Sequence, residues 1–184
     1  MELLDREPLR IARSEIGSNR KHRGNRFLTV IQYALDMSEC FVEMHRTLKP
    51  GATAIVVVGR ESRVRGVRFL NGALLAEVAT QCAGFAIAQW EARSFTNRFG
   101  VVIVEDVLTL TPARAPLLPN ARESIARAAA VARLSQGMSA DPAVRQDIAE
   151  AIGNSHAVKQ SPLYLAETEA SEACLLYTSD AADE

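Results

Sequence analysis

The feature that most constrains the fold is a run of five apolar residues, Ala54-Ile55-Val56-Val57-Val58, most of them β-branched. The run does not alternate between apolar and polar positions, as a strand with one face in water does. An unbroken run of this kind is typical of a strand covered on both faces, as in a parallel sheet. The sequence therefore predicts a central parallel strand at residues 54–58. An aspartate at Val57 would then be an unpaired buried carboxylate and should abolish folding.

Amphipathic helices are predicted on both sides of this strand. Before it, apolar residues recur at steps of four and three within residues 27–48, which places them on one helix face. These residues are Val30, Ala34, Met37, Phe41, Met44 and Leu48. Lys49-Pro50-Gly51 ends this helix, because proline cannot continue it and disfavours helical geometry at the preceding residue. After the strand, residues 71–82 form a second helix with the buried stripe Leu70, Leu74, Leu75, Val78, Ala79 and Cys82.

Two further strands are predicted after the second helix. Gly84 ends that helix, and strand-like runs at 85–95 and 101–110 flank a turn around residues 96–100. This spacing predicts an antiparallel hairpin. The order of helix, parallel strand, helix and antiparallel hairpin is that of one half of an open α/β sheet. The predicted fold class is therefore α/β, with a partial Rossmann-like sheet followed by a small helical region.

The small helical region follows a proline-rich linker at residues 113–119. Asn120-Ala121-Arg122-Glu123 has the spacing of a capping box, and Asp141-Pro142 places a cap before a first-turn proline. Helices are therefore predicted over 121–135 and 142–152. The predicted organisation has four parts: a connecting segment at 1–26, the sheet half at 27–112, the helical extension at 113–173 and a tail at 174–184.

Composition limits the function classes. The 184 residues carry a formal net charge of −1, so any basic site for nucleic acid must be local. No apolar run approaches the ~18 residues of a membrane helix, and no signal-type core follows the basic N-terminus, which predicts a cytoplasmic protein. The cysteines Cys40, Cys82 and Cys174 lack the spacing of a disulfide framework or zinc site, so we expect reduced thiols.

The last eleven residues are set apart from the fold. The stretch from Cys174 to Glu184, CLLYTSDAADE, resembles a translated sequencing-library adapter. We expect it to be a processing scar; an ordinary acidic, frayed tail is the alternative. Nucleotide sequence that does not spell an adapter through these codons would exclude the first interpretation.

A family resemblance is carried by the end of the first helix and the strand after it. Glu43-Met44-His45-Arg46-Thr47-Leu48-Lys49-Pro50-Gly51, followed by Ile55-Val56-Val57-Val58-Gly59, resembles the E-x-x-R-x-L-K-P-G-G helix end and fifth strand of S-adenosylmethionine-dependent methyltransferases. Gly84-Phe85 sits where that fold places its G-F before the sixth strand. Ala52 replaces the second glycine of the turn, which only requires an ordinary backbone angle there.

The wider stretch, roughly residues 8–110, resembles most closely the DNA methylases that modify the exocyclic amino group of adenine or cytosine. Its matching positions are Arg13-Ser14, Ile16-Gly17, Val58-Gly59, Ser62, Arg65-Gly66 and Glu105-Asp106. The resemblance implies a Rossmann-like methyltransferase domain, S-adenosylmethionine as the cofactor and DNA as the partner. Neither the methylated base nor the recognition sequence is evident from these residues.

The chain departs from that family at the catalytic elements. Neither the glycine-rich F-x-G-x-G loop for the cofactor nor the S-P-P-Y or D-P-P-Y element for the target amine is intact. Ser161-Pro162-Leu163-Tyr164 is a near match, but it lacks the second proline, and residues 157–160 are too short and polar for the buried strand that delivers the motif. We therefore assign no catalytic or cofactor-binding residue. We expect a truncated fragment that is inactive alone and self-associates through an exposed sheet edge.

Four arginines form the candidate nucleic-acid site. Arg60, Arg63, Arg65 and Arg68 follow the predicted strand directly, in a polar loop at 59–68. In open α/β sheets, ligands bind outside the carboxyl ends of the strands, so contact with DNA phosphates is one interpretation. The alternative is a solvated loop whose arginines pair with neighbouring acids such as Glu61.

Other chemistry-bearing residues favour structural roles. The histidines at 22, 45 and 156 lack ligand spacing, which argues against a metal site, and His45 is placed on the helix surface. We expect Cys40 and Cys82 to be core residues rather than nucleophiles. The aromatic residues Trp90, Phe95 and Phe99 could stack on a base, but hairpin core is favoured. Glu105 and Asp106 are adjacent strand residues that point to opposite faces, so they cannot form a dyad.

Three functions remain open from the sequence. The leading hypothesis is a fragment of a DNA amino-methyltransferase. The second is half of another S-adenosylmethionine-dependent methyltransferase, acting on RNA, protein or a small molecule. The third is a noncatalytic α/β interaction module.

Overall fold

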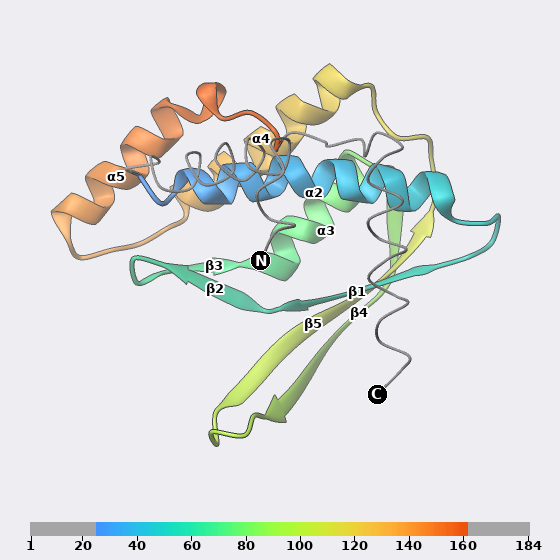
Figure 1. Ribbon diagram of the computed structural model, residues 1–184, viewed down its shortest axis with the longest axis horizontal. Helices are drawn as coiled ribbons and strands as arrows, with labels where there is room; N and C mark the ends of the chain where they lie inside the picture. The colour runs from blue at the N-terminus through green and yellow to red at the C-terminus, as the bar shows by residue number, and fades with distance from the viewer. Residues whose placement is uncertain (1–24, 162–184) are drawn as a thin grey trace, which may run out of the picture.

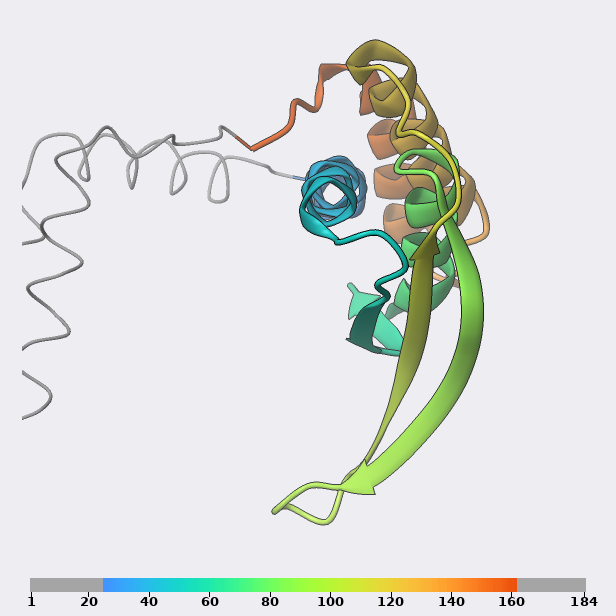
Figure 2. The same cartoon turned by 90° about the vertical axis from the view of Figure 1, so that its right-hand side faces the viewer.

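The computed structural model of the protein describes residues 25–161 (Figure 1). In chain order the elements are α2 (Leu28–Thr47), β1 (Ala54–Gly59), β2 (Glu61–Val64), β3 (Val67–Leu70), α3 (Asn71–Gln81), β4 (Phe85–Thr96), β5 (Val102–Pro112), α4 (Pro119–Ser135), α5 (Pro142–Gly153) and a 3-10 turn at Ser155–Ala157. The helices gather at one end of the sheet, and the β4–β5 hairpin projects away from them (Figure 2). The fold is α/β with antiparallel strand pairing.

α2 forms as the apolar spacing predicts. Val30, Ala34 and Phe41 are buried along one face. The helix ends at Thr47 and Leu48 is already extended, directly before Lys49, at which Pro50 disfavours helical geometry. A tight turn then leads into β1, with Gly51 in the left-handed region at φ +78°. The predicted boundary between the first helix and the first strand is therefore confirmed.

The sheet contradicts the predicted central parallel strand. Its order is β1-β5-β4, and both neighbouring pairs are antiparallel. Ala54 pairs with Leu110 and Gly59 with Glu105, and within residues 25–161 no strand pairs with the other edge of β1. The pairing direction changes because β5 returns along the chain and inserts beside β1. The unbroken apolar run is thus an edge strand here.

β1 is covered on one face only, which corrects the expectation of two-sided burial. Ala54 is buried on one face of the sheet. Ile55 and Val57, whose side chains lie on the opposite face, are 65% and 43% exposed. The reason is that α3 packs on the other face of the sheet, where Asp106 lies against its first turn. A carboxylate at Val57 would keep contact with water, so loss of folding in Val57→Asp does not follow.

One part of the predicted α/β pattern survives. β1 and β4 each run antiparallel to β5, so they point in the same direction. α3 joins them along the chain and contacts β1, β4 and β5. This is the strand–helix–strand crossover of α/β proteins, with β5 inserted between its two parallel strands.

The predicted polar loop at 59–68 is instead a second two-stranded sheet. β2 and β3 pair antiparallel, with Val64 opposite Val67. The two residues between the strands, Arg65 and Gly66, have φ of +49° and +82°. Two successive positive φ angles are the type I′ combination that suits a two-residue hairpin turn.

The helical region forms as predicted and packs on the sheet half. α4 contacts α2 and α3, and α5 contacts α4. Asp141 caps α5 by accepting a hydrogen bond from the backbone N–H of Ala143 at 2.9 Å, which confirms that cap. The predicted capping box of the earlier helix is wrong, because Pro119 begins α4 and Leu118 precedes it without a side-chain cap.

The β4–β5 hairpin is longer than predicted and solvent-exposed toward its tip. Trp90 and Phe95 are each 46% exposed and Phe99 is 72% exposed, so these rings do not form a hairpin core. The reason is that the distal hairpin extends beyond the helices that bury its base (Figure 2). The guanidinium of Arg98 lies over the ring of Phe99, 4.7 Å from its centroid.

Candidate functional site

The candidate arginines begin at the carboxyl end of β1 and follow the β2–β3 hairpin. Arg63 and Arg68 lie directly opposite each other on the two strands. Their side chains are 68% and 57% exposed, and both pair with Glu61, Arg63 at 3.6 Å. The register places Val64, Val67 and Phe69 on the opposite, inward side of the hairpin. Arg63 and Arg68 are therefore the two most exposed of the four candidate arginines.

Arg60 has a different role from its neighbours. Its Nε and Nη2 donate to Oδ1 of Asp106 at 3.0 and 2.9 Å, and the Asp106 side chain is only 6% exposed. Asp106 also lies against the first turn of α3, where a Cβ added at Gly72 would overlap its carboxylate. Because this buried acid needs a partner, Arg60 is a structural ligand of Asp106.

The four arginines do not converge on one point. Arg65, in the hairpin turn, pairs with Asp147 of α5, while Arg60 turns toward β5. Each candidate arginine thus has an acidic partner, as the solvated-loop alternative expects. A phosphate would have to compete with Glu61 for Arg63 and Arg68. The two arginines and this glutamate together carry a net charge of +1.

A groove of about 1320 Å³ lies between α2, the β2–β3 hairpin and residues 154–161. Tyr33 and Asp36 line it from α2, Ser62 and Phe69 from the hairpin, and Ser161 from the C-terminal side. Burial raises the pKa of Tyr33 above its usual range, and the charge of Cys40 adds to this. The tyrosine therefore remains a neutral hydroxyl at neutral pH.

Ser161, the first residue of the near-match motif, is fixed on α2. Its backbone N–H donates to Oδ1 of Asp36 and its hydroxyl donates to Oδ2, both at 2.8 Å. The amide of Gln32 donates to the same Asp36 carboxylate at 2.8 Å. These contacts fasten the C-terminal segment to α2 and occupy the carboxylate. Residues 162–164 of the motif lie outside the described residues.

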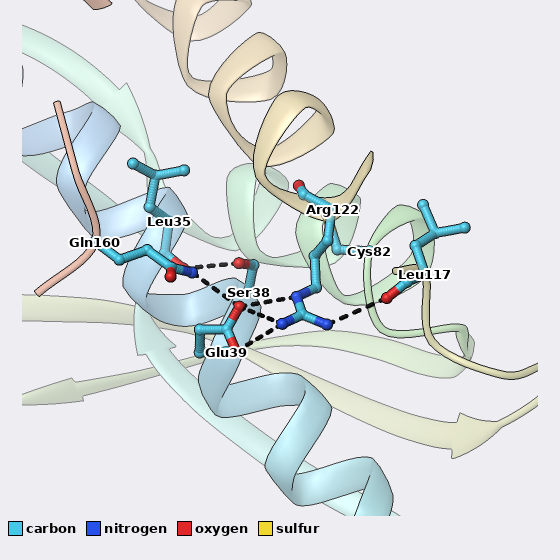
Figure 3. Close-up of polar contacts among 7 residues, drawn as sticks. All are labelled: Leu35, Ser38, Glu39, Cys82, Leu117, Arg122 and Gln160. Atoms are coloured by element: carbon cyan, nitrogen blue, oxygen red, sulfur yellow. Dashed lines mark hydrogen bonds and ion pairs between the residues drawn. The ribbon is translucent and has the colours of Figure 1, made fainter. Parts of the chain in front are cut away.

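A buried ion pair joins α2 to α4 (Figure 3). Arg122 donates through Nε and Nη2 to the carboxylate of Glu39 at 2.5 to 2.8 Å, and through Nη1 to the carbonyl of Leu117 at 3.1 Å. The amide of Gln160 donates to the same Glu39 at 2.8 Å. This network could not be read from the sequence, because its two charges are 83 residues apart and the capping-box spacing that includes Arg122 gives its side chain no role.

The cysteines divide between surface and core. Cys82 is fully buried, as predicted, whereas Cys40 is exposed, so the core assignment of Cys40 is wrong. Burial, with Glu77 and Glu39 nearby, raises the pKa of the Cys82 thiol to about 11 despite the opposing charge of Arg122. Cys82 therefore stays protonated at neutral pH and is a poor nucleophile. Cys174 lies outside the described residues.

The acids Glu105 and Asp106 and the histidine His45 have structural partners. Glu105 pairs with Arg93 at 2.7 Å and Asp106 with Arg60, from opposite faces of β5, so the two acids do not form a dyad. His45 is half-buried rather than on the surface, with its ring 5.2 Å from that of Phe85. Within residues 25–161 no cluster of three or more His, Cys, Asp or Glu side chains could hold a metal ion.

Comparisons with protein-family models, curated proteins and solved structures find no match to this chain. No helix among the described residues is long and apolar enough to cross a membrane.

Proposed function

We propose that residues 25–161 belong to an S-adenosylmethionine-dependent DNA methyltransferase that modifies the exocyclic amino group of adenine or cytosine. In this proposal they provide scaffold beside the transfer site. One observation carries it: the β1–α3–β4 crossover, which the chain enters through Leu48-Lys49-Pro50-Gly51, has β1 as its outer strand, and the outer edge of β1 has no neighbouring strand in the described range. Such an edge fits half of an α/β domain whose other strands are contributed separately.

The two glycines of the resemblance have backbone roles that support the proposal. Gly51, in the turn before β1, has φ +78°, and Gly84, before β4, has φ +74°. Both angles lie in the left-handed region, which glycine enters at little cost. The residues that carry the resemblance are therefore those that shape the entries to the two parallel strands.

Side chains of the chain itself occupy the junction between β1 and α3. The Arg60–Asp106 pair fills the space between the carboxyl end of β1 and the first turn of α3. Asn71 closes the same junction by donating from its side-chain amide to the carbonyl of Gly59 at 2.9 Å. This proposal therefore places the cofactor loop and the target-amine element outside residues 25–161, with the β1 side of the sheet as the wall next to them.

Extending the chain upstream from its own genomic DNA should restore methyl transfer. About a hundred codons would bring the sheet half to the size of a typical domain, and they should encode a glycine-rich loop and a P-P-Y element. The measurement is incorporation of labelled methyl groups from S-adenosylmethionine into mixed-sequence DNA. Alanine in place of the P-P-Y tyrosine is the matched control and should remove the activity.

Two results would contradict the proposal. One is upstream DNA that encodes neither element. The other is saturable binding of S-adenosylmethionine together with methyl transfer by the 184-residue chain alone, which would make Ser161 and the groove the first place to look for the active site.

The exposed arginines are expected to contact DNA phosphates in the extended protein. Replacing Arg63 or Arg68 by alanine should weaken binding to all sequences alike and lower the salt slope by about 1 each. Arg46→Ala, which removes an exposed arginine from the far end of α2, is the matched control and should leave the slope unchanged. An unchanged salt slope in the Arg63→Ala, Arg68→Ala double variant would contradict the phosphate contact and leave both arginines with the ion pair to Glu61 as their role.

A noncatalytic interaction module is the second candidate, favoured by the same open edge and by the exposure of Ile55 and Val57. It predicts a complete protein that binds a partner through this edge and has no methyltransferase elements upstream. The upstream DNA therefore discriminates between the two candidates.

A further inference from the structure

The free edge of β1 presents unpaired backbone groups at two residues. The backbone N–H of Arg60 points toward β5, because it donates to the carbonyl of Val104 at 2.9 Å, whereas the Arg60 carbonyl, beyond the end of β1, accepts from the N–H of Asn71 at 3.0 Å. Successive residues of a strand direct these groups to alternate sides. Those of Ile55 and Val57 therefore point away from β5. The carbonyl of Gly59, on the same outward side, accepts a hydrogen bond from Asn71, which agrees with this alternation.

The same two residues carry exposed apolar side chains. Ile55 and Val57 lie on the sheet face opposite α3 and are 65% and 43% exposed. An unpaired backbone edge and an uncovered apolar face therefore coincide at Ile55 and Val57, within the part of the chain that the structure describes.

β1 has none of the features by which edge strands usually avoid pairing. The segment from Ala54 to Gly59 contains no charged residue and no proline, and its register with β5 has no bulge. Edge strands in monomeric proteins are commonly interrupted by such residues or bulges. Because β1 is uncharged, two copies of it can lie side by side without opposing like charges.

We propose that two copies of the 184-residue chain pair through β1 in antiparallel fashion, across a twofold axis at Val56. Ile55 then lies opposite Val57 of the second copy, and their outward backbone groups form hydrogen bonds in both directions. The result is a continuous six-stranded sheet, β4-β5-β1 followed by β1-β5-β4 of the second copy. An isologous contact of this kind closes on itself and does not propagate into fibres.

The pairing also joins the exposed apolar side chains into one strip. A twofold axis perpendicular to the sheet places Ile55 and Val57 of both copies on the same face. The proposal concerns the chain by itself and does not depend on the proposed function. In the extended methyltransferase the preceding strand would occupy this edge, so the extended protein should be monomeric.

Light scattering coupled to gel filtration, across a dilution series, tests the pairing. The chain should have a mass of about 40 kDa, twice the 20.0 kDa of one copy. Ile55→Lys should raise the dissociation constant at least about tenfold, because two lysines would face the contact. Gln89→Lys is the matched control, since Gln89 lies in the same cross-strand row on the outer strand β4 and should leave the dimer intact.

Hydrogen exchange at the Val57 amide gives a second readout that does not depend on mass. This amide should be protected in the wild-type chain and in Gln89→Lys, and should exchange rapidly in Ile55→Lys while the circular dichroism spectrum stays native. Three outcomes would overturn the proposal: a monomer at all concentrations, a dimer that Ile55→Lys leaves unchanged, or a protected Val57 amide in a monomer. The last would show that a terminal segment of the same chain covers the edge.

Discussion

Replacing Arg122 by alanine is expected to lower the free energy of unfolding by about 2 to 4 kcal/mol. The Arg122 side chain is 9% exposed and holds the 21% exposed carboxylate of Glu39 through two of its nitrogens. Removing one partner of a buried pair leaves the other charge with little hydration, which typically costs 3–5 kcal/mol when burial is complete. The residual exposure of Glu39 reduces this cost. Urea unfolding followed by circular dichroism measures it.

The matched control is Arg46→Ala. Arg46 pairs with Glu43 at 2.8 Å on the same helix, α2, but both side chains are more than half exposed. An exposed pair contributes about 0 to 1 kcal/mol, so this variant should unfold almost like the wild type. Equal effects of Arg122→Ala and Arg46→Ala would show that the α2–α4 ion pair does not stabilise the fold.

Gly84→Ala is expected to destabilise the protein by about 2 to 4 kcal/mol. Gly84 has φ +74°, a conformation that costs a residue with a side chain about 1 kcal/mol or more. A Cβ at this position would also overlap the backbone carbonyl of Arg114, which cannot rotate away. The backbone N–H groups of Ala113 and Arg114 both donate to the Gly84 carbonyl at 3.0 Å and hold the two segments together. Overpacking of this kind adds about 1 to 3 kcal/mol.

Gly51→Ala separates the cost of the backbone angle from the cost of the steric overlap. Gly51 has a similar φ of +78°, but a Cβ there meets nothing within 4 Å. It should cost about 1 kcal/mol, from the backbone angle alone. If thermal unfolding shows the same loss of stability for Gly84→Ala and Gly51→Ala, the overlap with Arg114 has no energetic cost. The backbone around residue 84 would then move to accept the added Cβ.

The candidate site was only partly predictable. The position of the arginines directly after β1 could be read from sequence, because a charged cluster follows an apolar run there. Their partners could not, since Asp106 comes from 46 residues further along the chain. The exposure of Arg63 and Arg68 follows from the β2–β3 register, which places alternate residues on opposite faces. The buried contact of Arg60 depends instead on β5, which carries Asp106.

Sequence by itself determined the elements that depend on local spacing and caps. Apolar steps of three and four fixed α2, Pro50 ended it, and Asp141 began α5. These signals act over a few residues, so they do not require knowledge of the rest of the fold. The antiparallel hairpin was also predictable, because its two strands are joined by a short turn.

Only the tertiary structure decided what becomes of residues 54–58. The apolar run specified a strand, but its neighbours, its direction of pairing and its exposed face depend on where distant segments return. β5 inserts between β1 and β4, which makes both contacts antiparallel and leaves the other edge of β1 open within residues 25–161. An apolar side chain favours burial equally well against a helix, another strand or a second molecule, because the hydrophobic effect has no direction.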